Sequence, residues 1–126
     1  MTDSINTIQA SIDGACRKLE ETVRDFGISL TKDVSDAERL EEVLLLVQEM
    51  EDEAALSGAC FMVGAYLGEI IRKKLGGQWV TSADGVTAVQ LTNGEKVFSI
   101  EKARKFVASP DSDSLMFYMQ ALLSMK

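Results

Sequence analysis

Hydrophobic positions recur every three or four residues over most of the chain and alternate over only one short stretch. The longest apolar run, Ala54 to Gly68, carries no charge, and a helix that is apolar all round is buried in a core or in a membrane. A membrane-spanning helix needs about 20 apolar residues, whereas Glu69 interrupts this run and three basic residues begin at Arg72. The pattern therefore predicts a buried central helix, which Gly76-Gly77 ends because glycine takes the left-handed C′ conformation without steric cost.

Two amphipathic helices are predicted before the central one. The first runs from about Asp3 to the region of Gly27, with apolar positions at Ile5, Ile8, Ile12, Ala15, Leu19, Val23 and Phe26. The second begins at about Asp36, because Ser35 and Glu38 have the spacing of a capping box. Its predicted buried side consists of Leu40, Val43, Leu44, Val47 and Met50. Asp52 is a candidate cap if a new helix starts after Met50.

The other side of the second helix is acidic. It carries Glu38, Glu41, Glu42 and Glu49, and residues 51–53 continue the cluster. A cluster of this kind is either a solvated helix face or a docking surface for a cationic partner. Residues 1–53 hold 14 acids and 5 bases, whereas residues 54–126 hold 6 acids and 8 bases. The first half therefore repels phosphate and is not expected to bind nucleic acid.

After Trp79 the periodicity changes from helical to alternating. Asp84-Gly85 and Asn93-Gly94 are favoured in two-residue hairpin turns and predict a three-stranded antiparallel meander. With two-residue turns, one face of the sheet would carry Val80, Val89, Leu91 and Phe98. The other face would carry Trp79, Ala88, Gln90 and Val97, with Trp79 at the margin of the sheet, where its indole N–H can find a partner.

Two further helices are predicted after the meander. One begins at Ser99 or Glu101, and the other begins at Ser109-Pro110, with Leu115, Tyr118, Met119, Leu122 and Leu123 facing inward. The order of elements predicts a single α+β domain over residues 1–126, in which the N-terminal helices and the buried central helix pack on the meander and C-terminal helices close the fold.

The composition excludes several chemistries. The chain contains no histidine, which removes Ser-His and Cys-His nucleophile systems and histidine metal sites. Cys16 and Cys60 lack a metal-ligand spacing, and no glycine-rich phosphate loop is present. We therefore expect a protein with no cofactor, no metal site and no catalytic residues. The polar N-terminus lacks the pattern of a secretory leader, so a cytoplasmic protein without a membrane segment is expected.

Glu69 stands in apolar surroundings, where a carboxylate must be paired, hydrogen-bonded or neutral. Arg72 and Lys73 follow at i+3 and i+4 and are candidate partners. Glu69 is then a tethered structural acid near the helix end. Alternatively, it is a functional acid in a cleft beside Tyr66 and Trp79.

The run Gly64-Ala-Tyr-Leu-Gly-Glu69, followed by Gly76-Gly-Gln-Trp79, the strand pair and a closing helix from Leu115 to Leu123, resembles a known pattern. It is similar to small bacterial domains of unknown function with an L-G-E…G-G-x-W signature, some of which resemble immunity proteins of contact-dependent or secreted toxins. The resemblance covers the chain from Cys60 onward. It implies that Gly68, Glu69 and Trp79 hold a helix-to-strand corner together.

Taken together, these features predict a non-catalytic protein-binding domain of the immunity or adaptor kind. Its acidic residues Glu38, Glu41, Glu42 and Glu49 would bind a basic protein partner. Two alternatives stay open. One is a homo-oligomeric structural domain, such as a homodimer formed by exposed apolar residues of the first or last helix. The other is a small-molecule site at the Glu69 and Trp79 corner.

Overall fold

The computed structural model describes residues 2–109 and 114–124, with side chains from residue 7 onward, so the predicted core residue Ile5 lies outside the described side chains. Three helices come first, α1 (Thr2–Arg24), α2 (Asp36–Glu49) and α3 (Glu53–Leu75). A sheet follows, made of β1 (Gly77–Thr81), β2 (Thr87–Leu91) and β3 (Lys96–Val97), and then α4 (Ser99–Ala108) and α5 (Leu115–Ser124). Five helices with a three-stranded antiparallel sheet confirm the predicted α+β fold.

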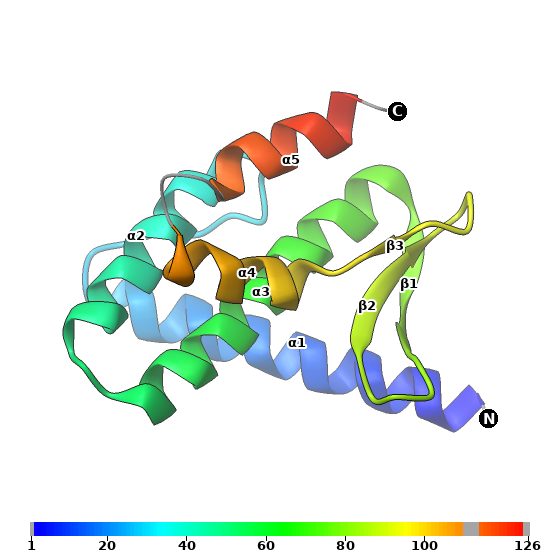
Figure 1. Cartoon of the computed structure of the whole chain (residues 1–126), viewed down its shortest axis with the longest axis horizontal. Coiled ribbons are helices and arrows are strands. Elements are labelled where there is room, and N and C mark those ends of the chain that lie inside the picture. The colour runs from blue at the N-terminus through cyan, green and yellow to red at the C-terminus, as the bar shows by residue number, and fades with distance from the viewer. Residues whose placement is uncertain (1, 110–113, 125–126) are drawn as a thin grey trace.

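The predicted buried helix is α3, which lies at the centre of the molecule and packs against α1, α2, α4, α5 and the first two strands (Figure 1). Its N-terminus is capped by Asp52, whose Oδ1 accepts a hydrogen bond of 3.1 Å from the Ala55 N–H, so α2 and α3 are separate helices. Its last turn ends at Gly76, where φ is +80°. Within the described residues, α3 alone is long and apolar enough to cross a membrane, but most of its apolar stretch is buried inside the protein, as in a core helix.

The sheet has the predicted order but a different register. Trp79 pairs with Val89, which pairs with Val97, so these three side chains share one face and are buried against the helices. The predicted stack of Val80, Val89 and Phe98 is therefore wrong. Trp79 lies on the edge strand β1, as predicted, but its side chain is only 1% exposed.

The register differs because both hairpin loops have three residues instead of two. The Ser82 and Val86 backbones pair across the first loop, and Leu91 and Glu95 pair across the second. In each loop the third residue is glycine with positive φ, Gly85 at +86° and Gly94 at +94°, which is the left-handed position of a three-residue hairpin. One residue more in the loop moves every side chain of the strand to the other face.

The predicted capping box at the start of α2 does not form. Ser35 has helical backbone angles and makes no side-chain bond to the helix end. The neighbouring Asp36 is fully buried instead, and its Oδ2 accepts from the backbone N–H groups of Thr31 (2.8 Å) and Asp33 (3.2 Å). Asp36 thus fixes the connection that leads from α1 into α2.

Most predicted core positions are confirmed, with two exceptions at helix ends. Leu40, Val43 and Leu44 of α2 are buried, but Met50 is 66% exposed because α2 ends at Glu49. Phe26 is 74% exposed because α1 ends at Arg24 and the chain turns away.

The last helix begins later than predicted. Ser109 ends α4, and α5 begins at Leu115. Pro110, the predicted first residue of this helix, lies outside the described residues.

Candidate functional site

The outward side of α2 carries the acidic residues that the sequence singled out. Glu38, Glu42 and Glu49 are exposed, and they lie on the same side of the helix as Leu45 and Leu46, which are 40% and 52% exposed. The opposite side carries the buried Leu40 and Leu44. We call Glu38, Glu42, Leu45, Leu46 and Glu49 the acidic face.

The acidic face has no basic residue within α2 to neutralise it. Arg39 is the single basic residue of this helix. Its guanidinium nitrogen Nη1 lies 3.3 Å from Oδ1 of the buried Asp36, so its charge compensates that carboxylate. The acidic face therefore presents net negative charge around two exposed leucines, an arrangement complementary to a cationic surface.

Glu41 does not belong to the acidic face, although the sequence placed it there. Its Oε2 accepts hydrogen bonds from the backbone N–H groups of Leu115 (2.6 Å) and Met116 (3.4 Å). These are the first residues of α5, where unpaired N–H groups and the positive end of the helix dipole favour a carboxylate. Glu41 is therefore half-buried and holds α5 against α2.

The three residues of the corner, Gly68, Glu69 and Trp79, are in mutual contact. A Cβ atom on Gly68 would lie 2.3 Å from Cη2 and Cζ2 of the Trp79 ring, far closer than carbon atoms can approach. One turn earlier, a Cβ atom on Gly64 would lie 2.3 Å from Cα of Ile100. This glycine side of α3 therefore receives both the indole ring and the start of α4. Ser99 Oγ stabilises this contact by donating a hydrogen bond of 2.7 Å to the Gly64 carbonyl oxygen.

Glu69 is 2% exposed and fully hydrogen-bonded. Its Oε2 accepts from Trp79 Nε1 and Arg72 Nε, both at 2.8 Å, and from Gln9 Nε2 at 3.3 Å, while Oε1 accepts from Arg72 Nη2 at 3.1 Å. Burial raises the pKa of the carboxyl, but the hydrogen bonds from Arg72, Trp79 and Gln9 outweigh it and leave the pKa below its usual value. Glu69 is therefore an ionised anchor that joins α1, α3 and β1.

Tyr66 takes part in a second buried network. Its hydroxyl donates to Glu20 Oε2 at 2.8 Å and accepts from the Lys32 N–H at 2.9 Å. Burial, with the bond to Glu20, raises the pKa of this hydroxyl well above its usual value. Tyr66, Glu69 and Trp79 are each at most 2% exposed, so the corner offers a ligand no accessible side chain. Its geometry favours a structural role over a small-molecule site.

Among the described residues there is no cluster of metal-ligating side chains and no exposed thiol. Within residues 2–109 and 114–124, no three Cys, Asp or Glu side chains come together as a metal site. Cys16 and Cys60 are free and buried, and burial raises the pKa of the Cys16 thiol to about 12, which keeps it protonated and unreactive.

Sequence reasoning missed three contributors. Gln9 reaches Glu69 across 60 positions, Asp36 was taken only as the start of a helix, and Leu45 and Leu46 were not recognised as exposed. The leucines carried a detectable signal, because α2 has more apolar residues than one buried stripe requires. No local signal predicts the bond to Gln9.

Comparison of the chain with protein-family models, with curated proteins and with solved structures finds no match.

Proposed function

We propose that this chain is a non-catalytic protein-binding domain of the bacterial cytoplasm, of the immunity or adaptor kind, which docks a cationic partner on the acidic face. The observation that supports the proposal most is the acidic face itself, in which three exposed carboxylates flank two exposed leucines without a neutralising base in α2. Apolar centres with charged surroundings are typical of protein interfaces, where the charges select the partner and speed association.

Affinity capture from the source cells tests the proposal. The tagged protein is used at low and high salt, together with a variant in which Glu38, Glu42 and Glu49 are replaced by lysine. We expect a basic protein to be captured in stoichiometric amount at low salt and to be lost at high salt, because salt screens exposed charges.

A matched control distinguishes an effect of the acidic face on capture from an effect of the protein's net charge. Reversing Glu21, Asp25 and Glu95, which are exposed and lie outside α2, changes the charge equally and should leave capture intact. Equal loss of capture in both variants, or capture of the same protein by all forms at high salt, would argue against docking on the acidic face.

A homo-oligomeric domain is the second candidate. Phe117 on α5 is 72% exposed, and Phe26, just beyond the end of α1, is 74% exposed, so an aromatic side chain faces solvent on α5 and another next to α1. Sedimentation at several protein concentrations tests this candidate, with Phe117→Ser as the variant expected to shift the protein toward the monomer. A monomer at all concentrations contradicts it.

A further inference from the structure

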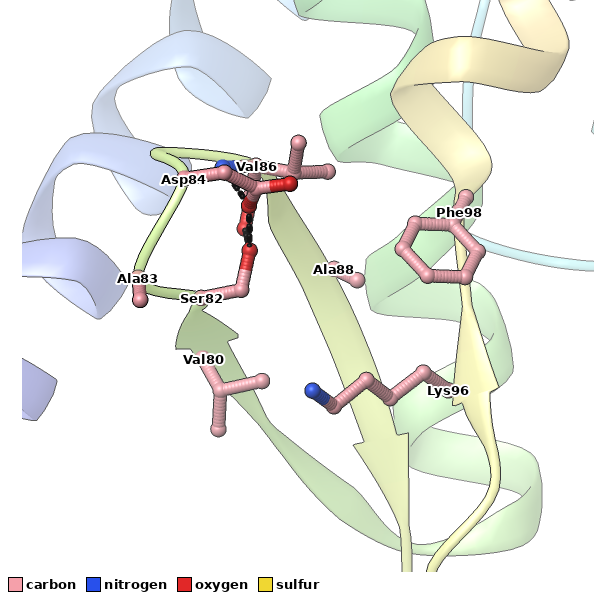
Figure 2. A pocket seen from close by; sticks show the side chains of 8 residues that line it. All are labelled: Val80, Ser82, Ala83, Asp84, Val86, Ala88, Lys96 and Phe98. Carbon is pink, nitrogen blue, oxygen red and sulfur yellow. Dashed lines mark hydrogen bonds between the residues drawn. The ribbon is translucent and has the colours of Figure 1, made fainter.

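The outer face of the sheet, opposite the helices, is the second unusual surface of the molecule. This face carries an open hollow of about 500 Å³ (Figure 2). The hollow is lined by Val80, Ala88, Lys96 and Phe98, together with Val86 and residues of the first hairpin loop. The solvent face of an antiparallel sheet is normally polar. Here five of the lining side chains are apolar, and Val86 and Phe98 are each about 40% exposed.

Ala88 forms the floor of the hollow. It is 1% exposed and lies outside the core cluster between sheet and helices, because its side chain points away from the helices and is covered by its neighbours on the outer face. Its neighbours Val80, Lys96 and Phe98 rise around it (Figure 2). The open space lies between the larger apolar side chains that surround Ala88, among them the exposed Val86 and Phe98.

Lys96 supplies the positive charge of the hollow, and Asp84 supplies a negative one at its rim. The Lys96 side chain extends from β3 across β2 toward Val80 (Figure 2), and its ammonium group makes no hydrogen bond or ion pair with the residues that the structure describes. Asp84, the acid at the rim, accepts hydrogen bonds from the Ser82 hydroxyl and the Val86 N–H within the hairpin loop. The bond from Ser82 and, to a smaller extent, the charge of Lys96 lower the pKa of the Asp84 carboxyl, so the two charges share the hollow. They form no ion pair within the described residues, and the ammonium donors stay available to an external anion.

We propose that this hollow binds a small apolar carboxylate, whose chain lies between Val80, Val86 and Phe98 and whose carboxylate pairs with Lys96. The volume lies within the range of small-molecule sites, in which apolar walls surround a few polar groups. The charge of Lys96 favours an anion on its side of the hollow, away from Asp84, and the apolar walls favour an apolar body. The site is separate from the acidic face and does not depend on the proposed protein partner.

Titration with octanoate, followed by two-dimensional NMR of backbone amides, tests the proposal. We expect octanoate to shift the resonances of residues 80, 86–88 and 96–98 in a saturable way, and octylamine, with the same chain and the opposite charge, to bind more weakly. Lys96→Gln should weaken octanoate binding about two- to fivefold, the range of an exposed ion pair, and should abolish the preference over octylamine.

Lys18→Gln is the matched control, because Lys18 is an exposed lysine on α1 outside the hollow. It should leave octanoate binding unchanged, and the amide spectra report whether each variant is folded. Absence of saturable shifts at the hollow in the wild type would overturn the proposal. So would an equal response to octanoate and octylamine, or an unchanged preference in Lys96→Gln.

Discussion

Gly68 makes room for Trp79 by having no side chain. The ring carbons of the indole lie where a Cβ atom would otherwise be, and the same indole N–H binds Glu69 one residue further along α3. The packing of the ring and its hydrogen bond therefore depend on one position of the helix. This explains how α3 tolerates a glycine in its buried middle, where glycine costs about 1 kcal/mol relative to alanine.

Gly68→Ala is therefore expected to destabilise the protein by about 1–3 kcal/mol, the usual cost of overpacking a core. Gly58→Ala is the matched control on the same helix, since nothing lies within 4 Å of its Cβ position. It should stabilise the protein by up to about 1 kcal/mol through helix propensity. Urea denaturation of both variants measures the difference, and equal effects would contradict the close contact between Gly68 and Trp79.

Glu69→Gln is expected to destabilise the protein by about 1–3 kcal/mol at pH 7, because it removes a charged acceptor from a buried network. The folded-state pKa of Glu69 lies below its usual value of 4.5. Its charge therefore stabilises the fold above that pH, and this contribution is lost as the pH falls through the folded-state pKa. The difference in unfolding free energy between wild type and variant should shrink in acid. A difference that stays constant from pH 7 to pH 3 would show that the charge is not what stabilises the corner.

The sequence predicted part of this corner. The spacing of Arg72 from Glu69 on one helix is visible in the sequence, and the structure confirms the pair. Lys73, the second predicted partner, makes no hydrogen bond or ion pair with Glu69 among the described residues. The bonds from Trp79 and Gln9 depend on how α1 and β1 cross α3, which no local pattern determines.

At the scale of elements, α5 is held by a side chain of another helix. Glu41 of α2 accepts from the first two N–H groups of α5. A carboxylate at this position commonly contributes about 1 kcal/mol. The docking of α5 therefore rests partly on one residue that the sequence had assigned to a binding surface.

Glu41→Ala is expected to loosen α5 without unfolding the rest of the protein. The amides of Leu115 and Met116 should exchange with solvent about fivefold faster, as a loss of about 1 kcal/mol implies. Glu42→Ala, which removes an exposed neighbouring carboxylate, is the control and should leave these amides unchanged. Equal exchange rates of these amides in both variants would show that Glu41 does not hold α5 in place.

The elements themselves were largely predictable, but their junctions were not. The buried helix, the amphipathic α1 and the meander all follow from hydrophobic periodicity. The predicted register was wrong because dipeptides such as Asp84-Gly85 and Asn93-Gly94 occur in both two-residue and three-residue loops. A register that places Trp79, Val89 and Val97 on one face gives a more apolar inner face than the predicted one. The alternation of apolar residues along the strands therefore indicated the register better than the turn dipeptides did.

At the scale of the whole molecule, the negative charge is concentrated in the first half of the chain, and α2 brings part of it to one surface beside exposed leucines. The sequence predicted the charge but not its grouping, because the position of α5 decides that Glu41 points away from solvent. The smaller acidic face of Glu38, Glu42 and Glu49 is the part that can meet a partner.

The dissociation constant of the captured partner tests the proposed function most directly. It is measured for the wild type, for the variant with Glu38, Glu42 and Glu49 changed to lysine, and for the control with Glu21, Asp25 and Glu95 changed to lysine. If each reversed charge costs about 1 kcal/mol, the first variant should bind about 100-fold more weakly, while the control binds like the wild type. Unchanged affinity in the first variant, with the fold intact, would contradict docking on the acidic face of α2.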